Sequence, residues 1–391
     1  MYHLKFSMCL GVALCAAAAW AQVMPATTSN SPVAYVYVSR KTNQTNEIVA
    51  YSAAANGKLS RVSGSPFKDN VYAMAVNGKY LMAANVTTPD IDAYLIGSDG
   101  SLTYTTSTNY AKFNDPNNPC GNALQMFFDR TGDSLYVIEI NASNACANDV
   151  IASFSVEKGS GGLKYLGLAS SGTFPGDYTL ASFIGNNVYA YSADQSGCVY
   201  PGVFGYQRAS DGLLNFVNNF TFNYPTPPPG VNAYYPDLAV TDSTNHVAIV
   251  EQPANPPGCA NGALQLATYT VEKNGNIHTN STYKNMPATQ IQSVFDMKMS
   301  PSGKLLAVAG QEGLQIFHFN GASPITHYTG LLTTEEINQM FWDNDNHLYA
   351  ISQNFGKLFV YTITPTTHQQ APGSPHAITS PQDIIVQPLS Q

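Results

Sequence analysis

Short runs of alternating apolar and polar residues fill most of the chain, and tight turns separate them. The clearest stretch runs from Phe295 to Ala309, where an apolar run leads into a Ser-Pro-Ser-Gly turn and a second apolar run follows. Such runs between turn residues predict β-strands. Two further strands are predicted at Leu314 to Phe319 and at Ile325 to Thr329, which makes a unit of four strands.

This unit repeats along the chain. Its first strand recurs at spacings of roughly 40 to 60 residues, which is the length of one four-stranded propeller blade. Hairpin signals such as Ser98 to Gly100 and Ser210 to Gly212 follow the third strand of several copies. We therefore predict an all-β fold, a seven-bladed β-propeller. The seven first strands are expected near Ala73, Leu124, Leu180, Asp237, Asp296, Gln339 and Asp383.

The two ends of the repeat region complement each other. The run from Ala34 to Val38 matches the second strand of the unit, and the run from Pro381 to Pro388 matches the first strand. One blade is therefore expected to be split between the ends, with the C-terminal strand paired to the N-terminal strands. This pairing closes the ring and removes two exposed sheet edges.

The N-terminus has the pattern of a secretory signal. Lys5 precedes an apolar run from Met8 to Trp20, and Ala19 and Ala21 supply the small residues that signal peptidase reads. The run is shorter than the ~20 apolar residues of a spanning helix, so no membrane span is expected. The predicted parts are a signal peptide (1–21), a polar lead-in (22–32) and the propeller (33–391). The protein is accordingly expected to be secreted or periplasmic.

The low content of charged residues and the negative net charge argue against a nucleic acid as the partner. Charged residues make up only 11% of the chain, and the formal net charge is −8. The 17 Lys and Arg are scattered along the sequence, so there is no basic stretch to bind a nucleic acid. We expect a small molecule, a sugar or a protein as the ligand, and a monomeric protein.

Export permits disulfides in the mature chain. Cys120 precedes a predicted first strand, whereas Cys146, Cys198 and Cys259 lie between second and third strands. Propeller topology places all four on one face. Three pairings are possible, and the simplest joins Cys120 to Cys146 and Cys198 to Cys259.

The repeat resembles that of a known family. Residues 300–308 and 78–85 are similar to the repeat of the lactonase-like seven-bladed propellers, which include 6-phosphogluconolactonase-type enzymes, carboxymuconate-cyclising enzymes and YVTN surface proteins. The resemblance covers roughly residues 33 to 389 and implies lactone hydrolysis by an Arg-His pair at the start of a first strand. This chain has other residues at the matching positions. They are Leu124 with Gln125, Pro236 with Asp237, Phe295 with Asp296, Asn338 with Gln339, and Gln382 with Asp383.

Polar residues recur at the start of the first strands, where they face the mouth of the channel. Three carboxylates and two amides would provide the oxygen ligands that suit Ca²⁺ or Mg²⁺, or the acceptors that suit sugar hydroxyls. Two adjacent carboxylates would also raise one pKa and provide a general acid. The alternative is that each Asp caps backbone N–H groups of a neighbouring blade. The predicted ligand-binding residues are Gln125, Asp237, Asp296, Gln339 and Asp383, with the three aspartates as metal ligands.

The histidines suggest no zinc site, because no pair has the spacing of metal ligands. His246 and His347 occupy the same turn in two blades and are expected to be surface residues. Two functional classes therefore remain. The first is an exported, non-catalytic propeller that binds a ligand through its top face and channel mouth. The second is a lactone hydrolase that uses the Asp cluster, with or without a metal.

Overall fold

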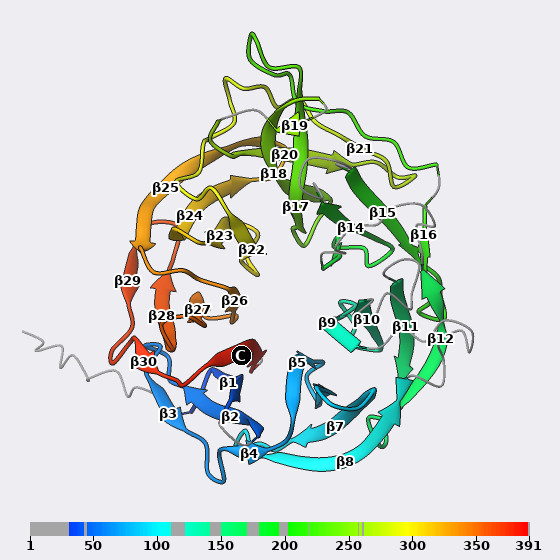
Figure 1. Ribbon diagram of the computed structural model, residues 1–391, viewed down its shortest axis with the longest axis vertical. Helices are drawn as coiled ribbons and strands as arrows, with labels where there is room; N and C mark the ends of the chain where they lie inside the picture. The colour runs from blue at the N-terminus through cyan, green and yellow to red at the C-terminus, as the bar shows by residue number, and fades with distance from the viewer. Residues whose placement is uncertain are drawn as a thin grey trace, which may run out of the picture. The chain divides into compact units, whose positions relative to one another are not determined.

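The computed structural model describes residues 31–42, 45–110, 122–140, 150–169, 180–194, 202–217, 219–256, 258–259 and 262–389. Residues 31–391 form one compact unit. Seven small antiparallel sheets of this unit stand in a circle around a central channel (Figure 1). The seven-bladed β-propeller expected from the sequence is thus confirmed.

Each blade runs outward from a first strand that lines the channel. Blade 1 contains β31 (Pro381–Pro388), β1 (Ala34–Lys41), β2 (Asn46–Ala53) and β3 (Leu59–Arg61), with β4 (Phe67–Lys68) beside β2. Blade 2 contains β5 (Val71–Val76), β6 (Tyr80–Asn85), β7 (Asp90–Ile96) and β8 (Leu102–Asn109). Blade 3 contains β9 (Asn122–Phe128), β10 (Ser134–Ile140), β11 (Val150–Val156) and β12 (Leu163–Ala169).

The remaining four blades follow the same order. Blade 4 contains β13 (Ser182–Phe183), β14 (Tyr189–Asp194), β15 (Gly202–Arg208) and β16 (Leu214–Phe216). Blade 5 contains β17 (Ala233–Thr241), β18 (His246–Asn255), β20 (Gln265–Val271) and β21 (Ile277–His278), with β19 (Gly258–Cys259) beside β18. Blade 6 contains β22 (Val294–Met299), β23 (Leu305–Gly310), β24 (Gly313–Asn320) and β25 (Ser323–Thr333). Blade 7 contains β26 (Gln339–Trp342), β27 (His347–Ser352), β28 (Lys357–Ile363) and β29 (His368–Gln370), with β30 (His376–Ala377) beside β28.

The two ends of the chain share blade 1. β31 pairs antiparallel with β1, and Ile384 lies opposite Val38 while Val386 lies opposite Val36. β2 pairs with the other edge of β1. The last strand of the chain therefore becomes the innermost strand of the sheet that the first strand begins, as the sequence predicted.

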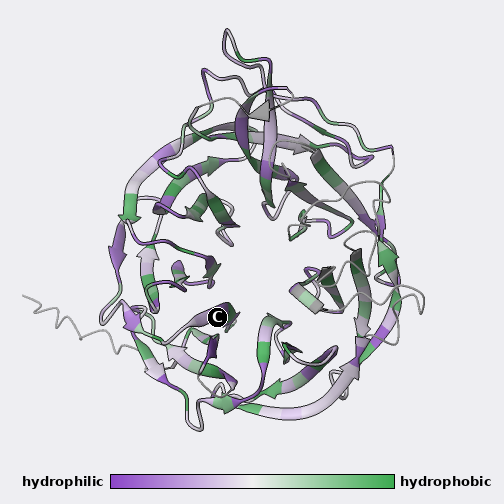
Figure 2. Ribbon diagram, viewed as in Figure 1, coloured by the Kyte–Doolittle hydropathy of each residue, from purple (hydrophilic) through white to green (hydrophobic). Residues whose placement is uncertain are grey.

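The hydrophobic core lies between the blades. Seven buried clusters are present, and each draws residues from two neighbouring blades. In one of them Tyr191 of blade 4 packs with Ile249 of blade 5. Among the outermost strands, β29 is purple in Figure 2, in agreement with its three exposed residues. Burial of the flat faces between blades, rather than inside any one sheet, holds the ring together.

Tyrosine hydroxyls tie each of three blades to the hairpin of the next. In every case a tyrosine on a second strand donates to the carbonyl of a glycine in the turn of the following blade. The pairs are Tyr37 with Gly100 at 3.0 Å, Tyr136 with Gly212 at 2.8 Å and Tyr191 with Gly275 at 2.7 Å.

We call the end of the ring where first strands begin the upper rim, and the end where they turn into second strands the lower rim. Five first strands carry a β-bulge or register shift near the upper rim. A bulge bends the strand and re-aims the side chains beside it. Four of the polar positions predicted from the sequence, Gln125, Asp237, Asp296 and Asp383, lie at or next to these irregularities. Gln339 lies in β26, which pairs with β27 in regular register.

Several predictions concern residues outside the described part of the chain. The signal peptide (1–21) and nearly all of the lead-in (22–32) lie there, as do Cys120, Cys146 and Cys198. Cys259 is described only as a backbone position in β19, opposite Ala254. The disulfide pairing therefore stays a prediction. Among the described residues, no helix has the length and apolar character needed to cross a membrane.

Candidate functional site

Three of the five predicted site residues link consecutive blades through the backbone. Asp296 Oδ2 accepts a hydrogen bond from the N–H of Met340 at 2.8 Å. Gln339 Oε1 accepts one from the N–H of Ile384 at 3.1 Å, and Asp383 Oδ2 accepts one from the N–H of Met74 at 2.5 Å. These bonds run in series from blade 6 to blade 7, blade 1 and blade 2. They are the contacts expected if the side chains cap a neighbouring blade, and a ligand role for these three stays a prediction.

Burial changes the ionisation of the two aspartates. The pKa of Asp383 is raised to about 7, mainly because burial disfavours its charged form, while the Met74 N–H opposes the rise. Burial also raises the pKa of Asp296, although Lys298 lies 2.7 Å away and lowers it. Both carboxyls thus favour the protonated form more than an exposed aspartate does.

The other two predicted residues lie elsewhere on the ring. Gln125 is half-buried in β9 of blade 3, and Asp237 is half-buried in β17 of blade 5. Asp237 follows Pro236, which pairs with Glu251 of β18 just before a register shift. Among the described residues, no three His, Cys, Asp or Glu side chains are grouped to hold a metal ion, which gives no support to a shared Ca²⁺ or Mg²⁺ site.

Glu251 is the site residue that sequence reasoning missed. Its side chain is fully buried, and Oε1 accepts a hydrogen bond from the Tyr269 hydroxyl at 2.6 Å. Oε2 is buried and has no hydrogen-bond partner among the residues that the structure describes. Burial raises the pKa of Glu251 to about 8; Tyr269 lowers the pKa and the nearby Asp237 raises it further. At neutral pH Glu251 is thus a protonated acid beside a second carboxyl group.

Tyrosine side chains lie near Glu251 and Asp237. Tyr234 is buried and donates its hydroxyl to Gln265 Oε1. Gln265 in turn donates to the carbonyl of Met286 at 2.9 Å, which fixes the amide. Burial and the nearby Glu251 raise the pKa of Tyr224. The upper rim of blade 5 therefore gathers two carboxyls, an amide and several phenols. Glu251 and Tyr234 are buried, whereas Asp237 is half-buried and Tyr224 is exposed. We call Asp237 and Glu251 the upper carboxyl pair.

The one clue in the sequence was the place of Glu251 in its strand. It directly follows the apolar run Val247 to Val250 in the middle of β18, and it is as fully buried as that run. A buried carboxyl is costly unless it is protonated or paired. The interblade contact that buries it depends on tertiary packing, which strand periodicity does not report.

The histidine prediction was wrong for His347. This residue is fully buried, with Nδ1 2.7 Å from Asp343 Oδ2 and its backbone N–H bonded to Asp343 Oδ1 at 2.9 Å. Tyr349 also donates to Asp343 at 2.8 Å. His246 makes the same contact with Asp242 but keeps some exposure. In each turn the aspartate bonds to the ring and the backbone N–H of the histidine four residues later. His246 and His347 therefore stabilise their own turns.

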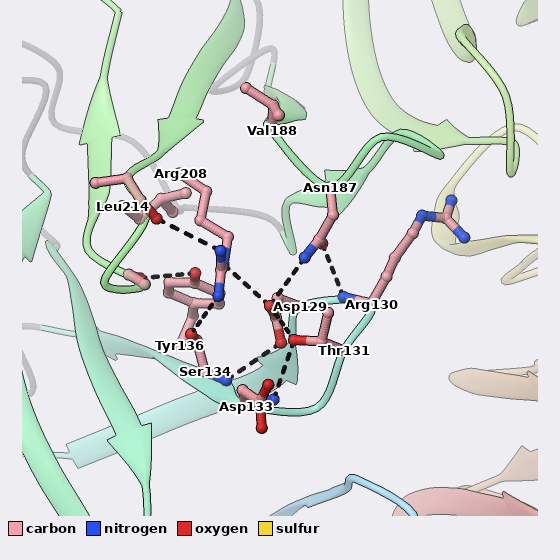
Figure 3. A network of polar contacts seen from close by, with 12 residues as sticks. Asp129, Arg130, Thr131, Asp133, Ser134, Tyr136, Asn187, Val188, Arg208 and Leu214 are labelled. Carbon is pink, nitrogen blue, oxygen red and sulfur yellow. Dashed lines mark hydrogen bonds and ion pairs between the residues drawn. The ribbon is translucent and has the colours of Figure 1, made fainter.

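A second polar network joins blades 3 and 4 at the lower rim (Figure 3). The buried Asp129 forms an ion pair with Arg208 at 3.0 Å and accepts hydrogen bonds from Asn187 at 2.9 Å and Thr131 at 2.7 Å. Arg130, the next residue, directs its guanidinium away from this network in Figure 3. Asp129 is saturated by its partners, so the network holds two blades together.

The fold is similar to that of several solved structures. A candidate 6-phosphogluconolactonase of Bacteroides fragilis matches with a TM-score of 0.65 and 11% identity, over 93% of this chain and 99% of that one. A candidate 6-phosphogluconolactonase of Bacteroides uniformis matches with a TM-score of 0.65 and 12% identity, over 90% and 99%. The periplasmic gluconolactonase of Pseudomonas aeruginosa matches with a TM-score of 0.64 and 15% identity, over 90% and 98%.

These similarities concern the fold, which is that of the lactonase-like seven-bladed propellers. No protein-family model matches the chain. No curated protein matches its sequence with significance. Because one fold serves many functions, activity has to be argued from the residues of the site.

Proposed function

We propose that the protein is an exported propeller that binds a small, hydroxyl-rich ligand at the upper rim of blade 5. The observation that carries this proposal is the upper carboxyl pair, in which the buried Glu251 lies near Asp237 and burial raises the pKa of Glu251 to about 8. A protonated carboxyl donates one hydrogen bond and a carboxylate accepts several, and hydroxyl groups of sugars need both kinds of partner. Tyr224, which lies near Glu251 and is exposed, can pack its ring on the apolar face of a sugar ring.

Export follows from the signal pattern at residues 1–21 and gives the ligand an extracytoplasmic source. The similarity to a periplasmic gluconolactonase is in keeping with this location. Cell fractionation of the full-length chain tests the location. We expect the mature protein outside the cytoplasm, with its N-terminus after residue 21; an intact N-terminus in the cytoplasm would contradict the proposal.

A lactone hydrolase is the second candidate, and the raised pKa of Glu251 favours it. Water would attack the lactone carbonyl and form a C–O bond while the ring C–O bond breaks. Asp237 would accept a proton from the water, and Glu251 would donate its proton to the ring oxygen. Transfer of a proton from Asp237 to Glu251 would then restore both groups. Such a carboxyl pair is a recognised arrangement for acid-base catalysis.

One set of proteins separates the two candidates. Glucose binding is measured by calorimetry, and hydrolysis of glucono-1,5-lactone is followed by acid release, for the wild type and for Glu251→Gln. Glu272→Gln is the control, because Glu272 belongs to the same blade and its side chain is half-exposed. A binding propeller should bind glucose and should not hydrolyse the lactone, and Glu251→Gln should weaken glucose binding by about tenfold, or ~1.4 kcal/mol.

Turnover above the spontaneous rate that is lost in Glu251→Gln but kept in Glu272→Gln would favour the hydrolase. Neither binding nor turnover in the wild type would contradict both candidates. Equal loss of binding or of turnover in Glu251→Gln and Glu272→Gln would show that the effect does not arise at the upper carboxyl pair.

A further inference from the structure

A separate pocket opens at the lower rim, between the first strands of blades 3, 4, 5 and 6. It has a volume of about 280 Å³. Its lining includes Thr241 of β17, which lies five residues after the Pro236 partner of Glu251. At the usual rise of a strand this separation is about 15 Å. The pocket is therefore distinct from the upper carboxyl pair.

The charged residues that line this pocket are both basic. Arg130 and Lys298 both line it, and no Asp or Glu is among its lining residues. The rest of the wall is made of apolar side chains and hydroxyl groups, with Phe127 and Phe183 on the apolar side and Ser300 among the hydroxyls. Each cation also has an aspartate nearby that does not line the pocket, Asp296 beside Lys298 and Asp242 near Arg130.

Arg130 is held in place by backbone carbonyls of two other blades. Its Nε donates to the carbonyls of Phe183 at 2.8 Å and Ile184 at 3.0 Å, and Nη2 donates to that of Asp242 at 2.6 Å. Nη1 donates no hydrogen bond to any residue that the structure describes. The guanidinium is thus fixed by one edge, and its remaining N–H groups are left to bind an anion as a fork.

Lys298 is positioned by a single partner. Its ammonium lies 2.7 Å from Asp296 Oδ1, and its side chain is one-quarter exposed. An ammonium group carries three N–H donors, so two remain beyond the bond to Asp296. The ammonium is therefore held by Asp296 and keeps N–H donors for a further partner.

We propose that the lower pocket binds a small organic acid, with its carboxylate between Arg130 and Lys298 and its apolar body against Phe127 and Phe183. The volume lies just below the usual range of ligand pockets, about 300 to 1,000 Å³, so the ligand is the size of a single ring. The aromatic wall favours a carboxylate on an apolar body over inorganic phosphate, which would leave that wall in contact with water. This site does not depend on the proposed function of the upper rim.

The test compares benzoate, its neutral amide benzamide and inorganic phosphate by calorimetry on the wild-type protein. Benzoate should bind, and its affinity should fall as salt is added, because the attraction is electrostatic. Benzamide and phosphate should bind at least tenfold more weakly. Equal binding of benzamide would overturn the role of the two cations, and stronger binding of phosphate would overturn the organic-acid class. Absence of benzoate binding would overturn the proposal.

Variants locate the site. Lys298→Gln should weaken benzoate binding by about tenfold or more, whereas Lys304→Gln should leave it unchanged, because Lys304 is exposed in the same blade and does not line the pocket. Glu251→Gln should also leave it unchanged, which separates this site from the upper rim. Equal affinity in Lys298→Gln and the wild type would contradict the assignment. Should Lys298→Gln fail to fold, the comparison of benzoate with benzamide on the wild type decides the question.

Discussion

Asp383, near the C-terminus, accepts a 2.5 Å hydrogen bond from the backbone N–H of Met74 in the second blade. The strand that carries Asp383 also pairs with β1. One residue of the closing strand therefore fastens blade 1 to blade 2, in addition to the pairing that completes the sheet. Asp383 thus occupies the recurring polar position of the first strands and also lies on the strand that closes the ring.

The raised pKa of Asp383 gives this contact a pH dependence. Its pKa is about 7 in the folded protein, compared with about 3.9 in an unfolded chain. Between these values the folded state binds more protons, so this residue makes stability fall as pH rises from about 4 to 7. Asp383→Asn keeps an acceptor oxygen but cannot ionise. We expect the melting temperature of the wild type, relative to Asp383→Asn, to fall between pH 5 and pH 8; a constant difference would contradict this account.

Substitution of two turn glycines distinguishes the energetic cost of backbone strain from the cost of disturbed packing between blades. Gly100 and Gly78 have φ angles of 81° and 93°, which disfavour any residue with a Cβ. A Cβ at Gly100 would overlap the Tyr35 ring, whereas none of the surrounding atoms lies within 4 Å of one at Gly78. We expect Gly78→Ala to cost about 1 kcal/mol and Gly100→Ala to cost about 2 kcal/mol more because of overpacking. Chemical denaturation measures both, and equal costs would rule out the packing contribution.

The ion pair between Asp129 and Arg208 should matter far more than its exposed counterpart. Arg208→Gln leaves the buried Asp129 without its cation, which should cost about 3 kcal/mol. The pair between Lys158 and Asp133 is exposed, so Lys158→Gln should change stability by less than about 1 kcal/mol. Equilibrium unfolding of the two variants provides the comparison. Similar small effects would mean that the hydrogen bonds to Asn187 and Thr131 are sufficient for Asp129.

Neighbours of Glu251 should move its pKa in opposite directions. Tyr269→Phe removes the hydrogen bond that stabilises the carboxylate, so the pKa of Glu251 should rise. Asp237→Asn removes the nearby negative charge, so the pKa should fall. Carbon NMR of protein labelled at glutamate carboxyls, with Glu251→Gln used to assign the signal, reports both shifts. Shifts of the same sign would show that the two residues act through changed burial instead.

Sequence periodicity was sufficient for the architecture because the unit is repeated seven times. The first strand of each blade could be located from its own copy of the unit. The two ends of the chain were identified as complementary parts of one blade. Precision fell where a blade departs from the repeat: Leu180 was taken to mark a first strand, yet β13 covers only Ser182–Phe183.

The site was less accessible to sequence reasoning. The recurring positions were found correctly, but Asp296, Gln339 and Asp383 bond to neighbouring backbone, and only packing determines that. Glu251 follows the second-strand run of blade 5 and Glu139 follows that of blade 3, so the repeat by itself did not single out Glu251. His347 was taken for a surface residue because its turn is polar, yet Asp343 satisfies the ring inside the core.

The pH dependence of glucose affinity tests the proposed site most directly. If protonated Glu251 donates a hydrogen bond to the ligand, affinity should decrease as pH rises through about 8, where this carboxyl ionises. The decrease should be absent in Glu251→Gln and present in Glu272→Gln. Affinity that is independent of pH in the wild type, or the same pH profile in Glu251→Gln, would contradict the assignment of the upper carboxyl pair as the ligand site.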